Sequence, residues 1–145
     1  MNSQENKRLV IAAWQAFASR DKQRTAAVFS DDAEWLAPKG NATALAMPYT
    51  NHMIGREQIA HFIALEFGKL FHADLKVDFR GFYAEDNVVI VEERMQATLS
   101  SGHHYDVEYC FVFELKEGLI RRVREYMDTL KGARMMFGSL DRMPA

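Results

Sequence analysis

Residues 104–129 read HYDVEYCFVFELKEGLIRRVREYMDT, and this stretch decides the fold. Apolar and polar side chains alternate along 104–115, which is the period-two pattern of a strand with one buried face. Lys116-Glu117-Gly118 then makes a short turn into a second strand over 119–129, so the two strands are neighbours and antiparallel. One face of the first strand is aromatic and is expected to lie in the core or in an interface between two copies: Tyr105, Tyr109, Phe111 and Phe113.

Two further strands are predicted upstream of this hairpin, over 74–84 and 88–99, and short turns again join them. The first half of the chain is helical instead. Apolar residues recur at helical spacing over 7–19, where Trp14 and Phe17 belong to the stripe, and a shorter helix follows from Asp21 to Phe29. A third helix runs from Gly55 to Leu70. Helices followed by a meander of long strands predict an α+β fold with the helices on one face of a curved sheet.

Between the second and third helices the sequence predicts a short extended run over 33–37 and then a long loop over 38–54. The loop has no clear periodicity, and such a loop commonly forms a lid or a pocket rim. The segment 131–145 is predicted to be a C-terminal tail that either covers the pocket or packs on the fold. The whole chain, 1–145, is expected to be one domain.

Composition excludes several classes of protein. The chain has 48% hydrophobic and 26% charged residues and a net charge of -2, with no concentrated basic face for nucleic acid. No long apolar stretch predicts a membrane span. The single cysteine, Cys110, excludes an internal disulfide, and the histidines lack metal-ligand spacing. We therefore expect a cytoplasmic protein with no metal and no cofactor, and neither nucleic acid nor a membrane as a partner.

Asp128 is the best candidate for a functional residue. A carboxylate is rare in a strand and costly to bury without a partner, and Asp128 comes at the end of the last predicted strand. Alternation puts Tyr126 and Asp128 on one face, and it puts Arg94 and Gln96 on one face of strand 88–99. If the two faces coincide, Arg94 pairs with Asp128 and fixes its rotamer. The functional hypothesis makes Asp128 a general base in an apolar pocket, and the alternative makes it an ordinary acid at a strand end.

Other acids look weaker. Glu92 and Glu93 are adjacent, so they point to opposite faces of their strand. One of them could be buried and paired, although a solvated acid is the more frequent outcome.

Several segments of the chain together resemble a known family. They are the helix with Trp14 and Phe17, the runs Phe29–Trp35 and Ile54–Ile59, and the closing segments Tyr109–Ile120 and Arg124–Asp128. The sequence resembles the SnoaL-like, ketosteroid-isomerase-like branch of the nuclear-transport-factor-2-like superfamily over nearly its whole length. The resemblance implies a cone-shaped fold in which a strongly curved mixed sheet wraps three helices around a deep apolar pocket. It also implies a homodimer formed through the outer face of the sheet.

Within that superfamily, the part from Asp86 to Thr129 is similar to the limonene-epoxide hydrolases. The resemblance matches Asp128 to the acid that activates water and Arg94 to the arginine that bridges two acids. Gln96 stands where the proton-donating acid is expected, and Gln cannot donate a proton in that way. Epoxide hydrolysis would therefore need an altered acid group.

The leading hypothesis is a cofactor-independent isomerase or cyclase that uses a pocket carboxylate as general acid and base on an apolar or polycyclic small molecule. Asp128 and Arg94 are the predicted catalytic residues. The predicted substrate-binding residues are Trp14, Trp35, Gln96 and Tyr126. Two alternatives stay open, namely a non-catalytic binding or interaction module of the same fold and an epoxide hydrolase with a different acid.

Overall fold

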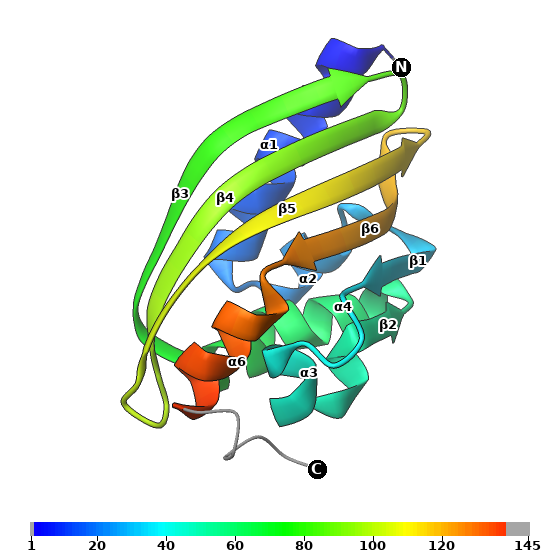
Figure 1. The fold of residues 1–145 in the computed structure, drawn as a ribbon. Coiled ribbons are helices and arrows are strands. Elements are labelled where there is room, and N and C mark those ends of the chain that lie inside the picture. Colours follow the sequence, from blue (N-terminus) through cyan, green and yellow to red (C-terminus); the bar gives the residue numbers. More distant parts are fainter. Residues whose placement is uncertain (1, 139–145) are drawn as a thin grey trace.

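A six-stranded mixed sheet organises the molecule (Figure 1). The computed structural model describes residues 2–138. The strand order is β2-β1-β6-β5-β4-β3, in which β1 and β6 run parallel and the other pairings are antiparallel. The strands are β1 (Phe29–Leu36), β2 (His52–Ile54), β3 (Phe71–Glu85), β4 (Val88–Leu99), β5 (His104–Lys116) and β6 (Leu119–Met127). The α+β class and the four long strands predicted from the sequence are confirmed.

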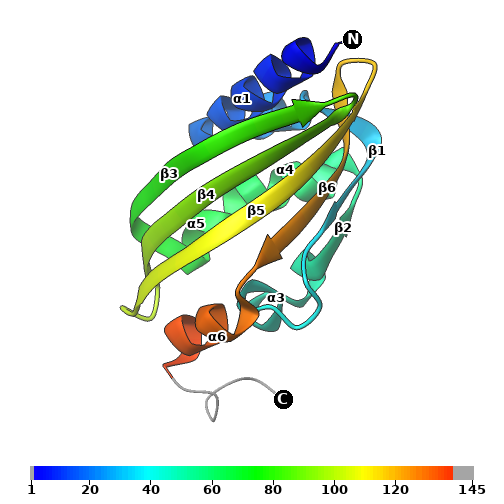
Figure 2. The same ribbon diagram turned by 45° about the horizontal axis from the view of Figure 1, so that its top comes forward.

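The helices of the N-terminal half pack on one face of this curved sheet, as Figure 2 shows for α1, α4 and α5. α1 (Ser3–Ser19) begins at Asn2, which forms a capping box with Glu5, and α2 (Lys22–Ala26) begins at Asp21. The predicted third helix is real but not uniform. It consists of α4 (Arg56–His61), the π-helical turn η2 (Phe62–Glu66) and α5 (Phe67–Leu70).

The segment 38–54 contains more structure than a loop, which corrects the prediction. It holds α3 (Ala42–Ala46), η1 (Pro48–Asn51) and the short edge strand β2. Asn41 starts α3, because its side chain accepts a hydrogen bond from the Ala44 backbone N–H at 3.1 Å. These elements are only three to five residues long, so a periodicity argument has too few residues to detect them.

The C-terminal segment also differs from the prediction. Residues 129–137 form α6 (Thr129–Phe137), and the rest of the predicted tail, 139–145, lies outside the described residues. Met136 is buried in the core and Met135 and Phe137 pack against it. Of the two roles considered for this segment, packing on the fold is therefore the one that residues 129–137 perform.

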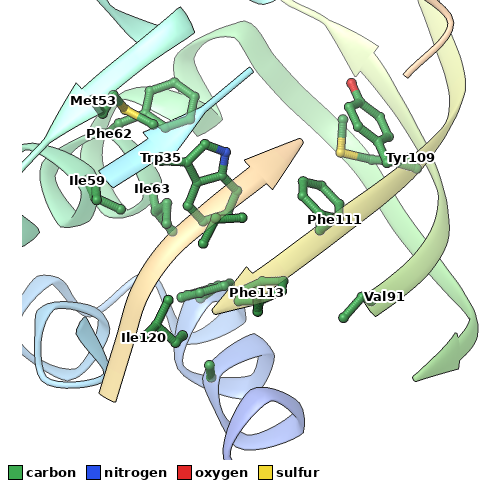
Figure 3. Packing of buried hydrophobic residues seen from close by; sticks show 14 of the residues in the cluster. Trp35, Met53, Ile59, Phe62, Ile63, Val91, Tyr109, Phe111, Phe113 and Ile120 are labelled. Carbon is green, nitrogen blue, oxygen red and sulfur yellow. The ribbon is translucent and has the colours of Figure 1, made fainter. Parts of the chain in front are cut away.

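Strict alternation on the central strands separates the core from the surface. On β4 the odd-numbered residues from Val89 to Leu99 face the helices and are buried, while the even-numbered ones lie on the outer face. On β5 the same holds from Tyr105 to Leu115, so the aromatic face of this strand belongs to the core. Figure 3 shows Tyr109, Phe111 and Phe113 of β5 beside Trp35 of β1 in this cluster.

Within residues 2–138, none of the helices has the length and apolar character that crossing a membrane requires. The structure describes one chain, and the homodimer stays a prediction, which sedimentation velocity can test.

Asp128 is the N-cap of α6, and this role generates a stability prediction. Its side chain accepts a hydrogen bond from the Lys131 backbone N–H at 3.0 Å, and the residue is exposed. We expect Asp128→Ala to lower the free energy of unfolding by about 1 kcal/mol, because the first turn of α6 loses its acceptor. Asp128→Asn should be nearly neutral, since Asn caps a helix as well as Asp does. Urea denaturation of the three proteins measures this, and equal stability of all three would contradict the capping role.

Candidate functional site

A cavity of about 180 Å³ lies between the helices and the concave face of the sheet. Most of its wall is apolar, and much of that wall is aromatic: Trp14, Phe17, Trp35, Phe62, Phe67, Phe71, Phe79 and Phe111. Four polar groups in its wall matter for chemistry. They are Glu93 on β4, Glu125 on β6, Tyr109 on β5 and Arg20 at the end of α1.

The aromatic wall is held rigidly by ring contacts. Phe111 stacks on Tyr109 with ring centroids 5.6 Å apart, and it meets Trp14 edge to face at 5.2 Å and Trp35 at 5.8 Å. Each such pair contributes about 0.5–1.5 kcal/mol beyond the area it buries. Three elements, α1, β1 and β5, are thereby fixed around one ring, and the cavity next to it keeps its shape.

Glu93 is a carboxyl group buried on an apolar face. It is 3% exposed, faces inward between Val91 and Met95, and lies opposite Phe79 and Tyr109 in the sheet register. Its Oε2 has no hydrogen-bond partner among the described residues. Burial in these surroundings raises the pKa of Glu93 to about 8, and the charge of Glu125 adds to the shift. Glu93 is therefore largely protonated at neutral pH.

Glu125 is the second carboxyl group in the cavity wall, and it lies opposite Phe111 in the register of β5 and β6. Trp35 donates its indole N–H to Glu125 Oε1 at 3.0 Å. Burial raises the pKa of Glu125 to about 7, and the indole hydrogen bond opposes part of that shift by favouring the charged form. At neutral pH a substantial fraction of Glu125 is therefore ionised and oriented by Trp35.

Tyr109 adds a hydroxyl group between the two acids. Its oxygen lies 2.6 Å from the hydroxyl oxygen of the fully buried Tyr105. Burial raises the pKa of Tyr109 well above its ordinary value, so the phenol stays neutral. When Tyr105 donates the shared hydrogen bond, the Tyr109 O–H remains available to donate to a ligand.

The site thus combines a proton donor and a proton acceptor inside an apolar cavity. Two carboxyl groups with pKa values raised to about 8 and about 7 can divide acid and base roles near neutral pH. Raised pKa values of this kind are typical of functional sites, because a core that serves only stability does not require acids in its interior. Among residues 2–138 there is no group of three His, Cys, Asp or Glu side chains arranged to hold a metal ion.

The structure separates the predicted catalytic pair, and the Arg94–Asp128 contact is wrong. Arg94 lies on the outer face of the sheet and forms a bidentate ion pair with Asp106, with Nε 2.8 Å from Oδ1 and Nη2 2.5 Å from Oδ2. Asp128 caps α6 and is exposed. Neither residue lines the cavity. The physical reason is that β6 ends at Met127, where the chain turns into a helix instead of continuing along the sheet.

Of the four predicted substrate-binding residues, two line the cavity and two do not. Trp14 and Trp35 line the cavity, and the Trp14 indole N–H has no partner among the described residues. Gln96 and Tyr126 lie on the outer face of the sheet, and Tyr126 is 52% exposed. The condition that these faces coincide is met, since Arg94, Gln96 and Tyr126 lie on the same side of the sheet, but that side faces away from the cavity.

Glu93 and Glu125 were missed, although the sequence contains a signal for both. Glu93 interrupts an apolar period-two series, and Glu125 stands between two apolar residues of its strand face. The series are Val89, Val91, Glu93, Met95, Ala97 and Leu99 on β4, and Val123, Glu125 and Met127 on β6. An acid at such a position must be buried with its strand face, so it requires an explanation more urgently than an acid on a mixed face.

Comparisons with known proteins agree with the fold. The family model for the SnoaL-like domain matches residues 10–123. No curated protein matches the sequence.

Solved structures share the fold at low identity. A nuclear-transport-factor-2-like protein from Burkholderia xenovorans is 22% identical, with 94% of this chain and 98% of that chain covered and a TM-score of 0.77. TerC, co-crystallised with polyporic acid, is 19% identical, with coverage of 91% and 98% and a TM-score of 0.76. An epoxide hydrolase from M. tuberculosis, described as similar to the limonene-epoxide hydrolases, is 19% identical, with coverage of 96% and 94% and a TM-score of 0.73.

The raised pKa values predict how stability depends on pH. The folded protein holds the Glu93 and Glu125 protons up to about pH 8 and about pH 7, whereas the unfolded chain releases them near 4.5. Between those limits the folded state binds more protons, so the free energy of unfolding should fall as pH rises from about 4.5 to about 8. Glu93→Gln should flatten this slope by up to about 1.4 kcal/mol per pH unit.

Chemical denaturation across this pH range measures the slope. Glu92→Gln is the matched control, because Glu92 is the exposed neighbour on the outer face and should leave the slope unchanged. An identical slope in the wild type and in Glu93→Gln would contradict the raised pKa of Glu93.

Proposed function

Since the chain belongs to the SnoaL-like domain family, we propose that it is a cofactor-independent isomerase acting on a compact apolar carbonyl compound. The observation that carries the proposal is the pair of acids in one aromatic cavity, the buried Glu93 and the half-buried Glu125, with pKa values raised to about 8 and about 7. One group keeps its proton at neutral pH while the other can accept one. This division of roles is what proton transfer next to a carbonyl group requires.

In the proposed reaction the ionised Glu125 removes a proton from the carbon between a carbonyl group and a double bond. The C–H electron pair moves toward the carbonyl oxygen, where the protonated Glu93 and the Tyr109 hydroxyl donate hydrogen bonds to the developing oxyanion. Glu125 then returns the proton to the far carbon of the double bond, which moves into conjugation with the carbonyl group. The product is an isomer of the substrate, so the reaction needs no oxidant, reductant or co-reactant.

The sheet register supports this division. β4 and β6 flank β5, so two strand spacings of about 4.8 Å, or roughly 10 Å, separate the backbones that carry the two acids. Tyr109 on the strand between them lies directly opposite Glu93, while Glu125 lies opposite Phe111, the next inward residue of β5. A single ring between the acids would have a carboxyl group on either side and the Phe111 face beneath it.

The size of the cavity restricts the substrate. Its volume of about 180 Å³ is near the roughly 150 Å³ of a protein cavity that takes up benzene. Sites for drug-sized ligands have about 300–1,000 Å³. We therefore propose a substrate with a single ring, in place of the polycyclic molecule that the resemblance implied.

A non-catalytic binding module is the second candidate. The unpaired indole N–H of Trp14, which lines the cavity, favours it because this group offers a hydrogen bond to a ligand without taking part in proton transfer. Epoxide hydrolysis through Asp128, Arg94 and Gln96 has no support in the geometry, since none of the three lines the cavity.

Turnover of a β,γ-unsaturated cyclohexenone to its conjugated isomer, followed by ultraviolet absorbance, tests the proposal. We expect Glu125→Gln to lower kcat about 10²–10⁴-fold, the usual effect of losing a general base. Glu93→Gln should cause a smaller loss, because the amide still donates a hydrogen bond although it cannot hold an acidic proton.

Glu92→Gln is again the control and should retain full activity, because Glu92 lies on the outer face. Thermal melts would establish that all variants are folded. Ligand binding in the cavity without any turnover would favour the binding module, and turnover that survives Glu125→Gln would overturn the catalytic role.

A further inference from the structure

A positive charge in the cavity wall has no acidic partner among residues 2–138. Arg20 follows α1 as its C-cap, in the left-handed conformation with φ of 57°, and its half-buried side chain lines the cavity beside Ile63 and Phe67. The carbon at the centre of its guanidinium lies 4.6 Å from the centre of the Phe67 ring. This cation–π contact orients the planar group at the cavity wall.

The hydrogen bonds of Arg20 are incomplete. Its Nη1 donates to the backbone oxygens of Phe17 at 3.3 Å and Ile63 at 3.1 Å. A guanidinium has five N–H donors, and the Nε and Nη2 groups of Arg20 have no acceptor among the described residues. The two carbonyl bonds therefore hold the group in place and leave its remaining edge available.

Five other arginines form ion pairs with acids: Arg56 with Asp31, Arg80 with Glu108, Arg94 with Asp106, and Arg122 and Arg124 with Glu114. The remaining arginines of residues 2–138 have no such pair among the described residues, but they are exposed: Arg8, Arg24, Arg121 and Arg134. No carboxylate of the described residues makes such a pair with Arg20, although this arginine is half-buried. Burial lowers the pKa of Arg20, and no neighbouring charge opposes the shift. A half-buried cation of this kind is stabilised when an anion pairs with it.

Arg20 and the two acids lie on different parts of the cavity wall. Trp14 lies six residues before Arg20, or about 9 Å along the helix axis at 1.5 Å per residue. Trp14 packs on Phe111, which lies opposite Glu125. Arg20 and the two acids therefore belong to different elements of one cavity wall, which aromatic rings otherwise line.

We propose that the cavity selects a single-ring compound that carries a carboxylate, and that Arg20 binds this carboxylate while the ring lies among the aromatic side chains. The inference rests on the proposed function for the role of the acids, and it adds the charge of the substrate. The planar fork of Arg20 matches a carboxylate in shape and charge. A neutral analogue leaves the guanidinium without an anionic partner and is therefore expected to bind more weakly than the carboxylate.

Binding of benzoate and of benzamide tests the proposal without requiring turnover. The two probes have nearly the same size and differ in charge. Both tryptophans of the chain, Trp14 and Trp35, line the cavity, so intrinsic fluorescence reports its occupancy directly. At pH 7 we expect benzoate to bind at least about 10-fold more tightly than benzamide, a difference that corresponds to one well-formed ion pair.

Arg20→Gln should abolish this preference by weakening benzoate binding and leaving benzamide binding unchanged. Arg20→Lys keeps the charge without the fork and should retain part of the preference. The matched control is Lys22→Gln, because Lys22 is an exposed cation two residues away that pairs with Glu57 at 3.6 Å and does not line the cavity. Thermal melts check that each variant is folded, and the lysine variant serves if the glutamine variant is not.

Equal affinity for the two probes, failure of both to bind, or a benzoate preference that persists in Arg20→Gln would overturn the proposal. A benzoate preference that depends on Arg20 supports it even if no isomerase activity is found. In that case the proposed reaction fails while the charge of the ligand is established, so the two ideas can be rejected separately.

Discussion

Alternation along a strand is the constraint on which both the core and the candidate site depend. Because successive side chains of β4, β5 and β6 point to opposite faces, every second side chain faces the helices, whether it is apolar or polar. Most of those positions hold Val, Phe, Tyr, Met or Leu and form the core. Glu93 and Glu125 occupy the same inward series, and the chain cannot turn them outward without reversing the whole strand face. Their burial is thus built into the sheet.

Placing the two carboxyl groups among apolar side chains raises their pKa values, and these raised values suit them to proton transfer. A carboxyl group surrounded by aromatic rings loses its hydration, so its neutral form becomes the favoured one and its pKa rises. The pKa values of the two groups, raised to about 8 and about 7, lie in the range where proton transfer at neutral pH is most effective. Arg20 supplies the opposite charge elsewhere in the same cavity wall. The cavity is therefore apolar in its bulk and polar at a few positions, which is the usual composition of a site for a small ligand.

Much of the fold could be predicted because its signals are long. The helix around Trp14 has 17 residues, and the alternating runs that form β4 and β5 have 12 and 13 residues. The short elements α3 and β2 were missed because so few residues give no reliable period. The strand predicted to reach residue 129 ends at Met127, because Asp128 is the N-cap of α6. Asp is one of the residues preferred at a helix N-cap, so its position after the strand also indicates a helix start. The candidate site was misplaced for a related reason. The site was sought on the faces that hold Arg94 and Tyr126, whereas the opposite, more apolar face of the same strands contains the acids. Comparing the two faces would have favoured Glu93.

The central claim is that two carboxyl groups inside the cavity keep their protons far above the ordinary range for glutamate. The most direct test is a ¹³C NMR titration of the glutamate side-chain carboxyl carbons, with Glu93→Gln and Glu125→Gln used to assign the two signals. The account predicts that the signals lost in these variants titrate near pH 8 and pH 7 in the wild type. Titration of both signals near the ordinary value of about 4.3 for glutamate would contradict it.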